Sequence, residues 1–233
     1  MIKKILINIA FKLLPGLKKS AFHAANSDVL GIIDEKYGYR NSFVNRRPLD
    51  KENNPLPWFT YPAIEYLSQL DLSQKDVLEW GSGNSSLFFA KRVKSIVSIE
   101  SDKNWFEEIS KQKYDNQEII FSEIDNYEEQ PKFLNKRFDV VIIDGKKRYE
   151  CAKVAGNYIN EGGIIILDNS DWYKNSARTL RKLGLIQVDF SGFGPINNYT
   201  WTTSVFFMRS FNFTAYDEIQ PKNSLGGIAN VCD

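Results

Sequence analysis

The sequence predicts an α/β domain in which helices cover both faces of a mostly parallel sheet. Strand-like runs alternate with helix-like segments from about residue 56 onward, and the runs at 138–143 and 164–167 are almost wholly aliphatic, as suits buried parallel strands. A glycine turn also joins an early strand to the helix that follows it. The 233 residues, 42% of them hydrophobic, suffice for one large core, so we expect a single α/β sandwich.

Each element has a local signal. A polar, proline-marked linker over 40–57 leads into a helix that begins near Pro62. Strands and helices are then expected at 77–79, 85–93, 95–99, 102–114, 118–121, 138–143, 149–158, 164–167 and 175–183. Ser101 is the expected cap of the helix at 102–114, residues 161–163 the expected turn, and Gly184 the expected stop of the last helix. The runs at 185–190 and 203–208 are joined by a loop too short for a crossover helix, which predicts an antiparallel pair.

One short stretch carries the most specific motif. An apolar run ends on Glu79 and opens into a turn with Gly81 and Gly83, whose backbone freedom lets a ligand lie against the main chain. A dinucleotide site would place a third glycine at Ser86, and its absence weighs against a nicotinamide-dependent oxidoreductase. About twenty residues on, the next run ends on Glu100, where a carboxylate can bind both hydroxyls of a ribose.

The segment Val77–Ser86, with Glu100 closing the next strand, resembles the first motif of the Rossmann-like S-adenosylmethionine-dependent methyltransferases, which is an acidic residue followed by Gly-x-Gly. The resemblance covers roughly residues 56–209. It implies a Rossmann-like three-layer sandwich with a mostly parallel seven-stranded sheet and one antiparallel strand near the C-terminus.

The same resemblance implies S-adenosyl-L-methionine as the cofactor. By it, Glu79, Gly81 and Gly83 border the methionine end, and Glu100 holds the ribose. Asp144, at the end of the 138–143 strand, is a further candidate for the cofactor site.

Two strand ends carry hard oxygen ligands, Asp144 on one and Asp168-Asn169 on the next. On neighbouring strands about 4.8 Å apart, two such carboxylates need a cation or a proton between them. The set resembles the metal site of catechol O-methyltransferase-like and bacterial sugar O-methyltransferases, which implies Mg²⁺ or another divalent cation on Asp144, Asp168 and Asn169. Lys147 matches a general-base lysine of the catechol family, so Lys147 and Asp144 are the predicted catalytic residues. Alternatives stay open for each role. Lys147 belongs to a basic run that is solvated in the usual case. Asp144 instead borders the cofactor while Asp168-Asn169 only caps the following loop, and Asp171 is a spare carboxylate that could replace either ligand.

The acceptor pocket is expected to use Trp172, Tyr173 and the loop at 191–201, which mixes aromatic faces with amides and hydroxyls as carbohydrate sites do. The predicted function is S-adenosylmethionine-dependent, metal-assisted O-methylation of a hydroxyl on a sugar or glycan intermediate. The alternatives are a metal-independent methyltransferase acting on nitrogen or a carboxylate, and an inactive cofactor-binding scaffold.

The predicted organisation is a basic amphipathic helix and linker over 1–55, a methyltransferase domain over 56–210 and a tail over 211–233. Apolar residues at helical spacing and five lysines in 1–20 fit packing on the domain, packing on a second subunit in a homo-oligomer, or peripheral membrane contact. No stretch approaches the roughly 20 apolar residues that span a bilayer. The net charge of +1 gives no support to a nucleic-acid partner, and Cys151 and Cys232 form no metal or redox pattern, which favours a cytoplasmic protein.

Overall fold

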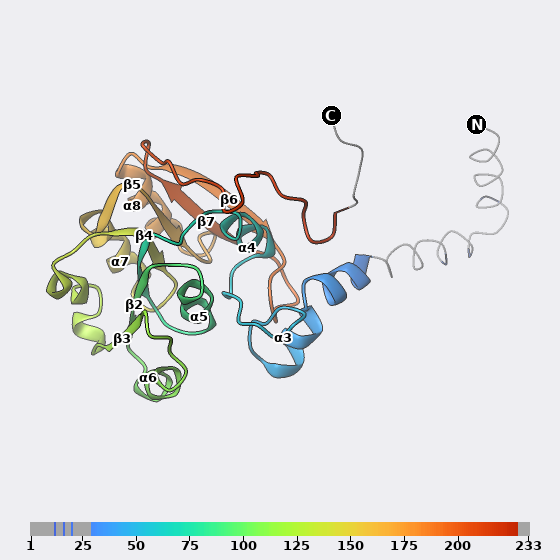
Figure 1. Cartoon of the computed structure of the whole chain (residues 1–233), viewed down its shortest axis with the longest axis horizontal. Coiled ribbons are helices and arrows are strands. Elements are labelled where there is room, and N and C mark those ends of the chain that lie inside the picture. The colour runs from blue at the N-terminus through green and yellow to red at the C-terminus, as the bar shows by residue number, and fades with distance from the viewer. Residues whose placement is uncertain (1–11, 13–15, 17–19, 21–28, 228–233) are drawn as a thin grey trace.

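The computed structural model describes residues 12, 16, 20 and 29–227. In this part of the chain a seven-stranded sheet in the order β3-β2-β1-β4-β5-β7-β6 forms the centre of the molecule (Figure 1). β7 runs antiparallel to both of its neighbours, β5 and β6, and all other neighbouring strands are parallel. The predicted fold class is therefore confirmed, including the single reversed strand near the C-terminus.

The observed elements follow the predicted order. The strands are β1 Asp76–Trp80, β2 Ser95–Glu100, β3 Gln117–Phe121, β4 Phe138–Ile143, β5 Ile159–Leu167, β6 Ile186–Gly192 and β7 Trp201–Phe207. The α-helices are α3 Tyr39–Asn45, α4 Tyr61–Leu67, α5 Asn84–Ala90, α6 Lys103–Ser110, α7 Arg148–Val154 and α8 Lys174–Lys182. Shorter helical turns are η1 Ile32–Lys36, η2 Ile124–Asn126, η3 Gln130–Leu134 and η4 Ala155–Asn157.

Alternation along the central strands divides the core between the two faces of the sheet. One face buries Val77, Ile96, Val140, Ile142 and Ile166 with residues of α4 and α5. The other buries Leu78, Trp80, Val141, Ile143 and Leu167 with residues of α7 and α8. Because helices cover both faces, the carboxyl ends of the strands are the edge at which a ligand has access.

The predicted turn at Glu161–Gly163 is wrong, because these residues lie inside β5, which shifts its register against β4. A side chain at Gly163 would come within 2.6 Å of the Asp139 carbonyl oxygen. The glycine therefore permits close approach of two strands, a use that local sequence does not distinguish from a turn.

The N-terminal part of the chain is only partly described. The predicted basic amphipathic helix at 1–20 lies outside the described residues apart from positions 12, 16 and 20. From residue 29 the chain forms η1 and α3 beside the domain (Figure 1). Tyr37 anchors this segment, because its ring lies 4.6 Å from that of Tyr61 and its hydroxyl donates to Glu65 Oε1 at 2.6 Å.

The segment after β7 returns to the domain. Phe213 is buried in the core beside α4, and Ala215 forms a bridge with Leu70. The domain limits at 55 and 210 stay predictions. None of the described helices combines the length and apolar character that crossing a bilayer requires.

Candidate active site

Two adjoining cavities lie at the carboxyl ends of β1, β4 and β5. They measure about 460 Å³ and about 150 Å³ and share a wall formed by Trp58, Ser82, Trp105 and Asp144. The larger is also lined by Arg148, Asp168, Asn169, Trp172, Asn197 and Tyr199. The smaller is also lined by Arg46, Arg47, Pro48, Gly83, Asn84 and Ser85. Open α/β sheets bind their ligands at this edge.

The turn after β1 packs against the turn after β4, backbone to backbone. Gly81 has a φ of +116°, and a side chain there would lie 3.1 Å from the Gly145 nitrogen. At Gly145 a side chain would lie 2.0 Å from the Tyr127 hydroxyl. Gly83 lines the smaller cavity, where an added Cβ would lie 3.7 Å from the ring of Trp105. The two predicted glycines thus shape the turn and leave room beside the indole.

Glu79 lies beneath this turn and lines neither cavity. Its carboxylate is fully buried and accepts hydrogen bonds from Ser85 Oγ at 2.5 Å, from Ser98 Oγ at 2.7 Å and from Ser86 Oγ. Burial raises the pKa of Glu79 to about 7, against the opposing effect of the three hydroxyls. Ser86, at the position of the missing third glycine, also accepts from the Gly83 N–H at 3.0 Å. In this arrangement Glu79 organises the turn from below, whereas we predicted that it borders a ligand.

Glu100 is buried at the end of β2, with most of its hydrogen-bonding capacity already used. Its Oε1 accepts from the N–H groups of Ser101 and Asp102, at 2.7 and 2.8 Å, and its Oε2 accepts from Ser82 Oγ at 2.8 Å. A carboxylate oxygen has two lone pairs, so Oε2 keeps room for one more donor. The predicted cap of α6 is wrong: Asp102 caps it, accepting from Trp105 N at 3.0 Å.

The guanidinium of Arg148 joins the ends of β4 and β5. Its Nη2 donates to Asp144 Oδ1 at 2.9 Å and to the Asp144 carbonyl at 2.7 Å, while Nη1 donates to Asn169 Oδ1 at 2.8 Å and to the Asp168 carbonyl at 2.6 Å. Its Nε donates to the Gly145 carbonyl at 3.0 Å. All five N–H groups of the guanidinium therefore have protein acceptors, and Arg148 fixes the two loops to one another.

Burial disfavours the charged forms of Asp144 and Asp168. Burial raises the pKa of Asp144 to about 6, and the charge of Arg148 opposes this rise. Burial also raises the pKa of Asp168 well above its usual range, and the charge of Asp144 adds to the rise. Asp168 Oδ1 accepts from Trp201 Nε1 at 3.1 Å and from Thr203 Oγ1 at 2.5 Å. The two neighbouring carboxyl groups thus disfavour a second negative charge at these strand ends.

The predicted magnesium ligands do come together, but they do not fit a divalent cation. Arg148 already occupies Asp144 Oδ1 and Asn169 Oδ1, two of the oxygens that the predicted ligand set offers. Its fixed positive charge would repel a metal ion at the same place. Among the described residues no group of three or more His, Cys, Asp or Glu side chains could hold a metal ion.

The structure places Lys147 away from both cavities. Lys147 has a φ of +47° at the start of α7, and its Nζ forms an ion pair with Glu128 and donates to the Ile124 carbonyl at 3.1 Å. The hydrogen bond with Glu128 raises the pKa of Lys147. An ammonium group stabilised in its charged form is a poor base, so this geometry favours the alternative that Lys147 is not catalytic.

The predicted acceptor residues separate into three environments. Trp172, Asn197 and Tyr199 line the larger cavity, as expected. Tyr173 lies under Arg148, with 4.7 Å between the guanidinium carbon and the ring centre. Phe193 faces a different groove. In the same segment Trp201 is buried, and Asp171 accepts from Thr202 N at 3.1 Å and lines neither cavity of the site.

Sequence reasoning missed Trp58, Trp105 and Arg148. Trp105 donates from Nε1 to the Ser82 carbonyl at 2.7 Å and so stands beside the glycine turn. Trp58 comes from the proline-marked segment before α4, which reads as a linker in the sequence. Arg148 was visible only as the last member of a basic run, and no local signal separates it from Lys147.

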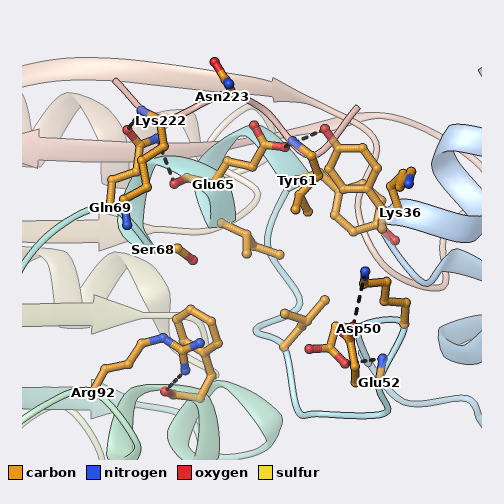
Figure 2. A pocket seen from close by; sticks show the side chains of 16 residues that line it. Lys36, Asp50, Glu52, Tyr61, Glu65, Ser68, Gln69, Arg92, Lys222 and Asn223 are labelled. Carbon is orange, nitrogen blue, oxygen red and sulfur yellow. Dashed lines mark hydrogen bonds and ion pairs between the residues drawn. The ribbon is translucent and has the colours of Figure 1, made fainter. Parts of the chain in front are cut away.

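Another cavity, of about 270 Å³, lies on the α4 and α5 side of the molecule (Figure 2). Figure 2 shows Glu65 from α4, Gln69 from the turn after α4, Arg92 from the turn after α5 and Lys222 from the C-terminal segment around it. None of the predicted site residues lines this cavity. It is therefore separate from the candidate active site.

Comparisons with known proteins establish the fold of this chain and no more. No protein-family model and no curated protein sequence matches the chain. Precorrin-6y C5,15-methyltransferase from Geobacter metallireducens GS-15 is similar in structure, with a TM-score of 0.51 and 11% identity over 63% of this chain and 87% of that one. Spermidine synthase from Thermotoga maritima is similar with a TM-score of 0.51 and 19% identity, over 66% of this chain and 57% of that chain. At these identities the likeness shows a shared α/β fold, one that a methyltransferase also has.

Proposed function

We propose that this chain is an S-adenosylmethionine-dependent methyltransferase that uses Asp144 as the general base for a hydroxyl acceptor. One observation carries the proposal: Asp144 stands in the wall shared by the two cavities, beside the glycine turn. Arg148 holds its Oδ1, while Oδ2 accepts no hydrogen bond from any residue that the structure describes. With a pKa of about 6, Asp144 is ionised at neutral pH and basic enough to accept a proton.

The residues around the smaller cavity suit the proposed cofactor. The space beside Gly83 would be filled by any side chain, and Trp105 offers an aromatic wall on its other side. Glu100 does not line this cavity, but it accepts a hydrogen bond from Ser82 of the cavity wall and keeps room for one further hydrogen bond, which a ribose hydroxyl would supply. When bound, S-adenosylmethionine supplies an electrophilic methyl group. These features support the cofactor that the Glu79-to-Gly83 motif predicts.

The larger cavity suits a carbohydrate acceptor. Trp58, Trp172 and Tyr199 stand at its mouth with 44%, 56% and 47% of their surfaces exposed, and Asn197 adds an amide. Aromatic faces beside polar groups bind the apolar faces and the hydroxyls of a sugar ring together. Asp144 Oδ2 would accept the proton of an acceptor hydroxyl in this cavity as that oxygen becomes the nucleophile for the methyl group.

This chemistry needs no metal ion. The sequence predicts a cation held by Asp144, Asp168 and Asn169, and in the structure the Arg148 guanidinium lies between Asp144 and Asn169. Arg148 therefore performs the charge-balancing task assigned to magnesium, while Asp144 performs the task assigned to Lys147.

The test combines binding and turnover. We expect micromolar binding of S-adenosylhomocysteine by calorimetry and methyl transfer from labelled S-adenosylmethionine to a panel of mono- and oligosaccharides. Asp144→Asn should bind S-adenosylhomocysteine within about threefold of wild type but lose about a hundredfold or more in turnover. Asp171→Asn, a carboxylate outside the site cavities, is the matched control and should keep both. Full turnover by Asp144→Asn would refute the base assignment, and tight binding without transfer to any acceptor would indicate a scaffold.

A further inference from the structure

The strand β6 ends the seven-stranded sheet, and its outer side is unpaired within the part of the chain that the structure describes. Its seven residues, Ile186–Gly192, pair with β7 in one continuous antiparallel register. At the opposite end of the sheet, β3 has only five residues. Unpaired backbone N–H and C=O groups along such an edge are a template for a further strand. The free side of β6 is therefore a candidate interaction surface.

β6 lacks the features by which edge strands usually avoid pairing. Its sequence, IQVDFSG, contains no lysine and no proline, and its register with β7 shows no bulge. Its one charged side chain, Asp189, is engaged within the sheet, because Oδ1 accepts from Gln187 Nε2 and from Ser204 Oγ of β7, both at 2.6 Å. Ile186 and Val188 lie on one face of the strand and are 47% and 41% exposed. Exposed apolar side chains on a regular edge favour association with another strand.

The sequence of β6 is complementary to itself in one antiparallel register. Because side chains alternate between faces, two copies continue one sheet with matching faces only when the register is centred on a residue. Centred on Val188, the two valines meet, and Ile186 of each copy faces Phe190 of the other. Gln187 then faces Asp189 of the other copy. A register centred on Asp189 would instead place two carboxylates directly opposite each other, which is destabilising.

Charge complementarity also favours a second copy as the partner. Arg181 of α8 lies beside Gln187, since its Nη1 donates to Gln187 Oε1 at 2.6 Å. In the register centred on Val188, each Arg181 guanidinium therefore comes close to Asp189 of the other copy. The two-fold symmetry of such an interface makes this contact twice.

We propose that β6 pairs with β6 of a second copy of this chain and forms a symmetric dimer with one sheet running through both copies. The interface adjoins the candidate site, because the loop that follows β6 contributes Asn197 and Tyr199 to the larger cavity. Dimerisation therefore holds the strand from which this loop starts.

Sedimentation velocity of the full chain tests this proposal without cofactor or acceptor, so its outcome is independent of methyl transfer. Wild type should sediment as a dimer at micromolar concentrations. Val188→Lys should raise the dissociation constant of the dimer about tenfold or more, because it places two ammonium groups together at the two-fold axis. Val44→Lys is the matched control, because Val44 is 70% exposed on α3, and it should dimerise as wild type does.

Two charge reversals test the register. Arg181→Glu and Asp189→Arg should each weaken the dimer, because each variant brings like charges together across the interface. Mixing the two variants in equal amounts should restore a dimer, because both contacts then join opposite charges. A purely structural role of either residue within its own subunit would not produce this rescue.

Three outcomes would overturn the proposal. A wild type that stays monomeric at every concentration would leave the edge to a different partner. A dimer that Val188→Lys leaves intact would place the interface elsewhere, and a mixture of the two charge reversals that stays monomeric would exclude the pairing centred on Val188. Circular dichroism of each variant ensures that only folded protein is compared.

Discussion

The buried carboxylate of Glu79 has a measurable cost at neutral and alkaline pH. Its pKa rises from 4.5 in the unfolded chain to about 7 in the folded protein because burial disfavours the charge. At about 1.4 kcal/mol per pKa unit this corresponds to roughly 3 kcal/mol. The stabilising contribution of the neutral form is complete below the unfolded pKa and is lost as pH rises through the folded pKa. About 2 kcal/mol of that loss falls between about pH 5.5 and pH 8.5.

The variant Glu79→Gln isolates this effect. Glutamine has nearly the same shape and can bond with the hydroxyls of Ser85, Ser86 and Ser98, but it does not ionise. Urea unfolding across this pH range should therefore show wild type losing about 2 kcal/mol relative to Glu79→Gln, with little change in m-value. Glu118→Gln, on the exposed side of β3, should follow wild type. Equal pH slopes for wild type and Glu79→Gln would refute our account of the buried carboxylate.

Three further predictions concern the site. The kcat/KM of wild type should rise with pH through about 6 as Asp144 ionises. In Arg148→Met this rise should move to higher pH, because the positive charge that lowers the pKa of Asp144 is lost, and Arg148→Lys should partly restore its position. A rise at the same pH in Arg148→Met would exclude Asp144 as the titrating base. Gly145→Ala should destabilise the fold by about 2 kcal/mol or more in urea, since its Cβ would overlap the Tyr127 hydroxyl, and unchanged stability would contradict the packing of the two turns. Treatment with EDTA should leave turnover within about twofold of the untreated enzyme, whereas a loss that magnesium restores would reinstate the metal prediction.

Much of the fold was predictable because its signals are local. The aliphatic runs of β4 and β5 are needed wherever a strand is buried on both faces, so their sequences report their place in the sheet. The short connection between β6 and β7 excluded a crossover helix and thereby predicted the reversed strand. The turn at Glu161–Gly163 failed for the opposite reason, because a glycine that admits a neighbouring strand looks like a glycine that makes a turn.

The site was predictable to the level of strand ends. Parallel strands bring their carboxyl ends to one edge, so Asp144, Asp168 and Asn169 were expected together and are found together. Trp58 gave no such signal, because distant residues hold the segment before α4 at the cavity: Tyr61 N donates to the Phe193 carbonyl, and Thr60 N donates to Thr203 Oγ1 of β7. Long-range contacts of this kind leave no periodic pattern in the chain.

By itself, the sequence determined the α/β class, the glycine turn and the set of polar residues at the ends of the central strands, since burial and backbone freedom act through residue type and spacing. Only the tertiary structure decided what those polar residues do. Lys147 and Arg148 are adjacent and carry the same charge, yet the left-handed backbone at Lys147 directs one side chain to Glu128 and the other between Asp144 and Asn169. That direction depends on how the loops pack in three dimensions, and it turns a predicted metal site into a carboxylate held by a guanidinium.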